Sequence, residues 1–203
     1  MITNYLKIAF RNLQKHIGYT LINILGLAVG ITCFLVILLF VRDELSFDRF
    51  HKNAEQIYRI HDATPYVDKD WAATPWGTAE LIANQFGDRV EVTRFFRMSS
   101  ASATIRHGEN AFVESGILLA EPNVFEIFDF PLLQGDAKTA LNDPYSLLMS
   151  DRMAKKYFRD EPPVGKTVTI DDTLFQVTGV LKNVPHNSHI QFDFLAPVSY
   201  RFR

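Results

Sequence analysis

The sequence predicts an α+β protein: an N-terminal amphipathic helix and a transmembrane helix, followed by an extracytoplasmic α+β domain with a mixed or antiparallel sheet. Three observations predict this class. Residues 19–41 contain no charged side chain, residues 1–18 contain cations but no acid, and strand-like and helix-like stretches alternate afterwards. The roughly 160 residues after the apolar run suit one compact domain or two smaller subdomains.

Residues 19–41 are long enough to cross a bilayer. At about 1.5 Å per residue they extend roughly 34 Å, against a hydrocarbon core of about 30 Å. A cleaved signal peptide is the alternative, but its apolar region usually spans about 7–15 residues and ends at a small-x-small site. Here the longer run is followed by Arg42-Asp43-Glu44-Leu45, which favours a retained transmembrane helix.

The charges on the two sides of this helix predict its orientation. All 23 acidic residues lie at or beyond Asp43, and the cations of residues 1–18 are unopposed. Short basic flanks stay cytoplasmic, so we expect the N-terminus inside and residues 42–203 outside. From residue 43 onward, 17 cations stand against 23 anions. The resulting net charge of −6 argues against nucleic-acid binding.

Residues 1–18 have the periodicity of an amphipathic helix. Apolar side chains recur at helical spacing from Ile2 to Leu13, and polar side chains occupy the opposite face. This pattern predicts a helix in the cytoplasmic headgroup layer, with an elbow at Gly18. The predicted membrane-interface anchors are Lys7, Arg11, Lys15 and, at the far end of the transmembrane helix, Arg42.

Small residues inside the apolar run predict a helix-packing face. Gly26 and Gly30 form a Gly-xxx-Gly pair, which allows another helix to approach closely. The alternative is that glycine is simply common in transmembrane helices. Cys33 is the single cysteine, so it has no cysteine partner for an intrachain disulfide.

The pattern of the remaining chain predicts a series of short elements. Helices are expected at 75–86, 124–128 (capped by Asn123) and up to Phe158 (capped by Ser150). Hairpins are expected at 102–114 and, around an Asp171-Asp172 turn, at 167–180. The further extended stretches expected are 56–60, 90–96, 146–149 and 189–195, the last pairing with the second hairpin.

The motifs that could carry chemistry are weak. Gly165-Lys166-Thr167 lacks the earlier glycine of a phosphate-binding loop and precedes a strand. His186 and His189 have no accompanying ligand pattern. Aromatic pairs around an aspartate, as in residues 47–50, 128–130 and 192–194, are expected to be packing residues. We therefore predict no catalytic, cofactor-binding or metal-binding residue and no enzyme activity.

Several strings resemble bacterial ABC transporter permeases of the MacB and FtsX-like kind, over nearly the whole chain. The strings near the start are NYLKIAFRNL (4–13), ILGLA (24–28), FDRFH (47–51) and IYR (57–59). Those resembling the MacB-like periplasmic core domain are FEIF (125–128), LQGD (133–136), AKKYF (154–158), PVGKT (163–167) and VTGV (177–180).

The resemblance implies a permease subunit of the bacterial inner membrane. It implies residues 1–18 in the cytoplasmic interface, 19–41 across the bilayer and a periplasmic core domain at 42–203. The partners implied are a separate ABC ATPase, a second permease copy and a periplasmic protein. ATP-driven motion would be relayed to the periplasm for export or mechanotransmission. Permeases of this kind have three further spans, so the chain resembles an N-terminal fragment. The alternative function is a single-pass, membrane-anchored sensor or binding domain.

Overall fold

The computed structural model describes residues 2–61, 73–97 and 102–201. The chain divides into two compact units, residues 1–47 and residues 48–203, which we treat separately. The ends of the ranges predicted from the sequence, Met1 and residues 202–203, lie outside the described residues. The second unit, hereafter the α+β domain, is one compact body rather than two subdomains.

The first unit consists of two helices, α1 (Ile2–Lys15) and α2 (Ile17–Glu44). The break between them is at His16, whose φ of −119° and ψ of 49° leave the helical region. The Thr20 hydroxyl donates to the Leu13 carbonyl oxygen at 3.1 Å and so satisfies a terminal carbonyl of α1. The elbow predicted at Gly18 is therefore wrong, because that residue lies within α2. Among the described residues, α2 is the one helix long and apolar enough to cross a membrane.

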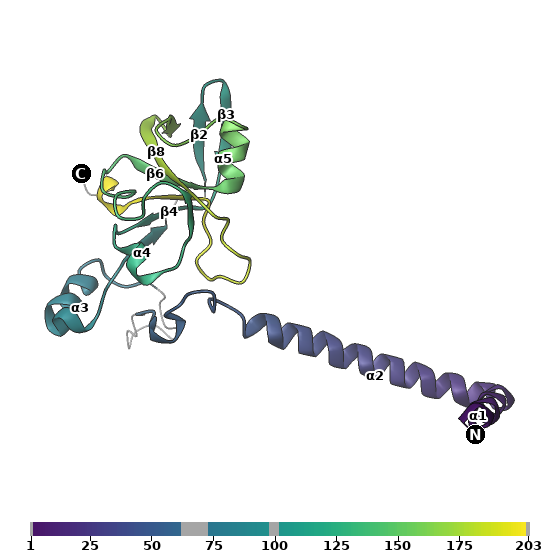
Figure 1. Ribbon diagram of the computed structural model, residues 1–203. Helices are drawn as coiled ribbons and strands as arrows, with labels where there is room; N and C mark the ends of the chain where they lie inside the picture. The colour runs from purple at the N-terminus through teal and green to yellow at the C-terminus, as the bar shows by residue number, and fades with distance from the viewer. Residues whose placement is uncertain (1, 62–72, 98–101, 202–203) are drawn as a thin grey trace. The chain divides into compact units, whose positions relative to one another are not determined.

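The α+β domain is built on a mixed sheet (Figure 1). In the described part of the chain the sheet has nine strands in the order β1-β4-β9-β6-β8-β7-β2-β3, and β5 pairs with β8. The pairs β4·β9 and β6·β8 are parallel, and the others are antiparallel. The strands are β1 (Phe95–Arg97), β2 (Ala103–His107), β3 (Asn110–Glu114), β4 (Ile117–Ala120), β5 (Leu132–Gln134), β6 (Ser146–Ser150), β7 (Thr167–Ile170), β8 (Thr173–Leu181) and β9 (Phe194–Pro197).

Short helices connect these strands. They are η1 (Ala54–Gln56), α3 (Thr78–Phe86), η2 (Gly87–Arg89), α4 (Val124–Ile127), α5 (Asp151–Phe158) and η3 (Val198–Tyr200). Helix α5 lies beside the β2–β3 hairpin in Figure 1. The predicted α+β class with a mixed sheet is confirmed.

Local chemistry explains the elements that the sequence predicted correctly. The Ser150 hydroxyl accepts a hydrogen bond from the Met153 N–H at 3.4 Å and caps α5, as expected. Asp171 and Asp172 have φ values of 41° and 72° and form the tight turn between β7 and β8. Gly108, with a φ of 56°, turns the chain between β2 and β3.

Other predictions are wrong because an alternating or capping pattern does not by itself provide a partner strand or a capping bond. Residues 57–60 are irregular, and Tyr58 is 81% exposed. Within 90–96 only the end is a strand, at β1. In 189–195 the strand begins at Phe194, and it pairs with β4 and β6 rather than with the second hairpin. Asn123 makes no capping bond: its side-chain nitrogen donates to the Val92 carbonyl oxygen, and its side-chain oxygen has no hydrogen-bond partner among the described residues.

The central strands are buried on both faces. Along β9, Phe194 belongs to one hydrophobic cluster and Leu195 to a second. The same alternation occurs at Met149 and Leu148 of β6. Successive side chains of a strand point to opposite faces, so the two clusters lie on opposite sides of the sheet. This explains why β4 and the middle of β6, residues 147–149, are uninterrupted apolar runs, the pattern of strands covered on both faces.

Gly179 is required by close packing in β8. A Cβ atom there would lie 2.7 Å from both the Gln134 carbonyl oxygen and Leu148 Cδ2. We therefore expect Gly179→Ala to lower the free energy of unfolding by about 1–3 kcal/mol, the usual effect of overpacking. Urea denaturation of the full chain in detergent measures this. Gly77→Ala is the control, since its Cβ would meet open space, and an equal loss in both variants would contradict the packing argument.

Candidate functional site

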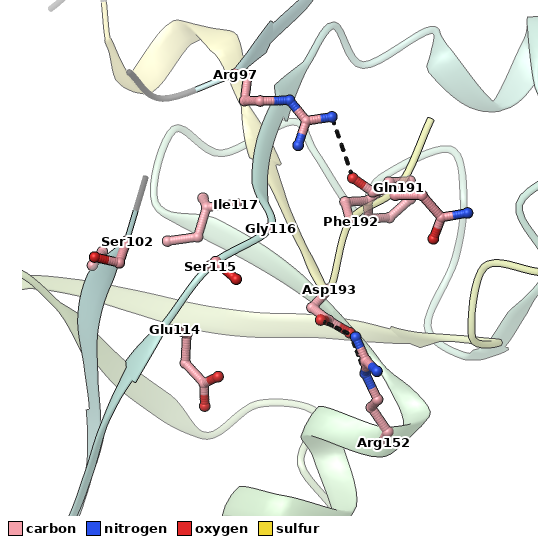
Figure 2. Close-up of a pocket in the computed structure, with 11 residues that line it drawn as sticks. Arg97, Ser102, Glu114, Ser115, Gly116, Ile117, Arg152, Gln191, Phe192 and Asp193 are labelled. Atoms are coloured by element: carbon pink, nitrogen blue, oxygen red, sulfur yellow. Dashed lines mark hydrogen bonds and ion pairs between the residues drawn. The ribbon is translucent and has the colours of Figure 1, made fainter. Parts of the chain in front are cut away.

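A cleft of about 420 Å³, lined by both charged and apolar side chains, opens beside the sheet (Figure 2). It lies where the ends of β1 and β3 meet the two-residue link, Ser115 and Gly116, that leads into β4. The side chains that line it include Arg97, Glu114 and Arg152. Two cations and two acids, Glu114 and Asp193, therefore share this cleft.

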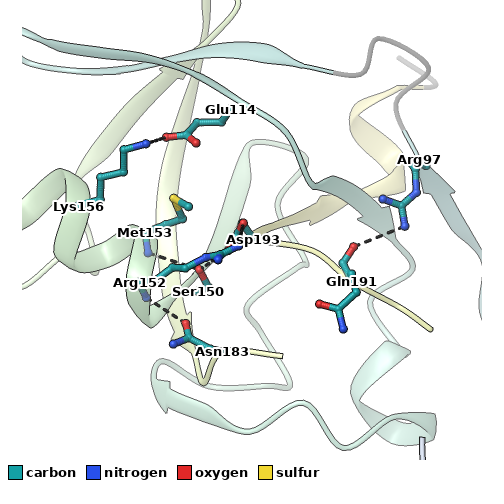
Figure 3. Close-up of polar contacts among 9 residues, drawn as sticks. All are labelled: Arg97, Glu114, Ser150, Arg152, Met153, Lys156, Asn183, Gln191 and Asp193. Carbon is teal, nitrogen blue, oxygen red and sulfur yellow. Dashed lines mark hydrogen bonds and ion pairs between the residues drawn. The ribbon is translucent and has the colours of Figure 1, made fainter. Parts of the chain in front are cut away.

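Asp193 is the centre of the polar contacts on one side of the cleft (Figure 3). It accepts hydrogen bonds from the Ser150 hydroxyl at 2.8 Å and from Arg152 Nε at 2.8 Å, and Arg152 Nη2 forms an ion pair with its other oxygen. These bonds raise the pKa of Arg152. The Arg152 N–H also donates to Asn183 Oδ1 at 3.0 Å. The network fixes the start of α5 against the segment before β9.

Glu114 forms the second polar group of the cleft. It accepts from Lys156 Nζ at 2.6 Å and from the Tyr157 hydroxyl at 2.9 Å. Burial, reinforced by the hydrogen bond to Glu114, raises the pKa of Tyr157 far above its ordinary value, so this hydroxyl remains a donor. Both acids of the cleft thus already have cationic partners. In the described ranges, no group of three or more His, Cys, Asp or Glu side chains is arranged to hold a metal ion.

A second site lies at the start of the α+β domain, in residues 48–52, which we call the junction segment. Its first residue, Asp48, has a left-handed φ of 54°. The Asp48 carboxylate accepts from the Ser188 hydroxyl at 2.8 Å and from the His189 N–H at 3.1 Å, and His189 Nδ1 lies 2.7 Å from its other oxygen. The Asp48 N–H donates to the Asn187 carbonyl oxygen at 2.9 Å. One loop thus fixes this residue through backbone and side chain.

The other end of the junction segment is bound to Asp129. The Lys52 N–H donates to Asp129 Oδ2 at 2.6 Å, and the Asp129 N–H donates to His51 Nδ1 at 3.0 Å. His51 is only 3% exposed. Its ring lies 4.0 Å from that of Phe50 and makes edge contacts with Phe128 and Phe130 at 5.2 and 5.4 Å between centroids.

The titration of the junction segment follows from these contacts. Burial lowers the pKa of His51 below its ordinary value of 6.5, although the charges of Asp48 and Asp129 oppose this. For Asp48, burial alone would raise the pKa, but the hydrogen bonds from His189 and Ser188 outweigh burial and lower it. The neutral imidazole and the ionised carboxylate are therefore the forms that this site favours.

The sequence analysis did not predict the roles of Asp48, Asp129 and Asp193 in these contacts. It assigned the aromatic residues beside them to packing, and Phe130, Phe192 and Phe194 are indeed buried. The intervening Asp129 and Asp193 hold together segments that are distant in sequence. The sequence nevertheless indicated a structural role, because a carboxylate placed between aromatic residues of a core needs polar partners.

Family membership follows from a comparison with known families. The sequence matches the family model of the MacB-like periplasmic core domain over residues 20–202. The chain belongs to this family. MacB-like periplasmic core domains occur in permease components of ABC-type transporters.

Individual relatives of this MacB-like chain are more distant. A macrolide export ATP-binding/permease protein MacB of Syntrophobacter fumaroxidans is 32% identical over 84 residues, which are 40% of this chain and 12% of that protein. A domain of a protein named as a permease from Porphyromonas gingivalis is 26% identical, with a TM-score of 0.55, over 65% of this chain and 56% of that one. The periplasmic region of MacB from Actinobacillus actinomycetemcomitans is 21% identical, with a TM-score of 0.47, over 60% and 54%.

The site residues predicted from the sequence lie outside both sites of the MacB-like domain. Lys7, Arg11 and Lys15 lie on α1 and are exposed, and Arg42 lies in the last turn of α2. Gly26 and Gly30 lie on α2 with open space beside them. Their roles at a membrane interface and in helix packing stay predictions.

Proposed function

We propose that this chain is part of an ABC transporter permease subunit that relays motion of a separate ATPase from the cytoplasm to the periplasm. The observation that carries the proposal is the junction segment. It is separated from the end of α2 by three residues, and it is bound to the α+β domain through both side chains and backbone. A short connection with fixed ends transmits force, whereas a flexible linker absorbs it.

The remaining features fit the same role. Helix α2 is the bilayer-crossing segment, with α1 in the cytoplasmic headgroup layer and Lys7, Arg11 and Lys15 facing anionic lipid. Arg42 marks the periplasmic end of α2. Gly26 and Gly30 provide a packing face for other transmembrane helices. The subunit works with a second copy of itself, and the α+β domain acts on a substrate or on a periplasmic partner protein.

Decoupling the junction segment tests the proposal. In the complete permease, purified with its ATPase and with Cys33 replaced by serine, a spin label at exposed Leu174 reports the distance between the two copies. We expect this distance to change between the ATP-free and vanadate-trapped states. Six Gly/Ser residues inserted after Glu44 should abolish the change while leaving the ATPase bound and the α+β domain folded.

The matched control is the same insertion between Gly108 and Glu109, in the exposed turn of the β2–β3 hairpin. It should leave the distance change intact. An unaltered change after the insertion at Glu44 would contradict mechanical coupling through the junction segment. A permease that does not copurify with any ATPase would instead favour a single-pass binding module.

A further inference from the structure

The buried ring of His51 has an arrangement that only its neutral form can satisfy. Its Nδ1 accepts the Asp129 N–H, so the proton of the neutral ring is on Nε2. Nε2 is buried and has no hydrogen-bond partner among the described residues. The surrounding rings of Phe50, Phe128 and Phe130 offer no acceptor other than their π faces.

Protonation would change this contact from attractive to repulsive. A second proton must be placed on Nδ1, where it would face the Asp129 N–H at a donor–acceptor separation of 3.0 Å. Two N–H groups cannot share one hydrogen bond. The imidazolium would also have to remain in an apolar pocket with 3% of its surface exposed.

We propose that protonation of His51 releases the junction segment from the α+β domain, so that residues 48–52 form an acid-sensitive latch. The effect of the latch on transport rests on the proposed function: in the working permease, acid would uncouple the α+β domain from the transmembrane helix. The latch itself is a property of the α+β domain.

The charged groups near His51 oppose the effect of burial on its pKa. Two acids act on the ring: Asp48 in the junction segment and Asp129 in the loop after α4. The negative charge of each favours the imidazolium. Asp129 is itself paired with Lys52, at 3.5 Å from Nζ, and Asp48 with His189. Burial outweighs these charges, since the net effect is to lower the pKa of His51.

The sign of the pH dependence follows by linkage. The released ring titrates at its ordinary value of 6.5, whereas the bound ring resists protonation. Binding of the junction segment is therefore at full strength above that pH and weakens as the pH falls through it. If the bound ring stays neutral, lowering the pH from 7.5 to 5.5 increases the released population by up to about tenfold.

Hydrogen–deuterium exchange of the full chain in detergent, without ATPase, tests the latch. After correction for intrinsic exchange, protection of the Lys52 and Asp129 amides should fall by up to about tenfold between pH 7.5 and 5.5. The Ser150 amide, which donates to the Asp193 carbonyl oxygen, should keep its protection. Unchanged protection at Lys52 and Asp129, or an equal fall at Ser150, would overturn the proposal.

Two variants isolate His51. His51→Asn keeps an acceptor in the position of Nδ1 but cannot titrate, so its protection should not depend on pH. His107→Asn makes the same exchange at a half-buried ring outside the junction segment, which contacts the Thr167 carbonyl oxygen and Phe158, and it should behave as the wild type. A pH-dependent loss in His51→Asn equal to that of the wild type would overturn the latch. A working latch together with unaltered motion after the Glu44 insertion would refute only the proposed coupling.

Discussion

Replacing Phe194 by alanine is expected to lower the free energy of unfolding of the α+β domain by about 3–5 kcal/mol. Phe194 is fully buried in β9, where it pairs with Ile117 of β4 and Met149 of β6. Its ring also makes an edge contact with Tyr157 of α5, at 6.3 Å between centroids. Truncation therefore opens a cavity where three elements meet, and the loss is a large share of the about 5–15 kcal/mol typical of a folded domain.

Urea denaturation of the full chain in detergent measures this effect, followed by tryptophan fluorescence. Trp76 is a suitable probe because it packs against the hydrophobic cluster that contains Phe194. Leu174→Ala is the control: this side chain is 59% exposed on β8, so its removal should cost less than about 1 kcal/mol. A loss below about 1 kcal/mol for Phe194→Ala would contradict the central position of β9.

Asp48→Ala is expected to lower the free energy of unfolding by about 2–4 kcal/mol. The change removes hydrogen bonds from Ser188 and from two atoms of His189 to an ionised carboxylate, which together contribute about 1.5–3 kcal/mol. It also places alanine at a φ of 54°, at a further cost of about 1 kcal/mol. The same denaturation experiment at pH 7 measures this change.

Asp48→Asn is the matched control. Asparagine tolerates a left-handed backbone and keeps an oxygen that accepts from Ser188, so we expect less than half of the loss. Because the pKa of Asp48 is lowered from 3.8, its stabilising contribution is present above that pH. The difference between the wild type and Asp48→Ala should thus shrink as the pH falls below 3.8. Equal losses in both variants at pH 7 would contradict the role of the carboxylate.

Local chemistry determined which elements could be predicted from the sequence. Ser150 and the Asp171-Asp172 turn specify their structure within a few residues, so α5 and the β7–β8 hairpin were predicted correctly. Residues 57–60 and 189–193 alternate like strands, but no strand pairs with them in the described part of the chain, so they stay irregular. The prediction of the partners of β9 is wrong for a related reason: nothing in residues 194–197 themselves indicates that they pair with β4 and β6.

The candidate sites were harder to predict than the fold. Asp48 and His189 are 141 positions apart, and His51 and Asp129 are 78 apart, so no short motif contains either pair. What the sequence did contain was the repeated placement of an aspartate between aromatic residues. That pattern identifies a residue that needs partners, but it does not identify the partners.

The position of β9 has a consequence for biosynthesis. This strand is the last of the described chain to leave the ribosome, yet it fills the middle of the sheet between β4 and β6. Without residues 194–197 the strands form two unequal groups, β1-β4 on one side and the six strands from β6 to β3 and β5 on the other, and β4 and β6 have unpaired edges. The sheet is therefore complete only after Pro197 has been translated, long after α1 and α2 have been synthesised.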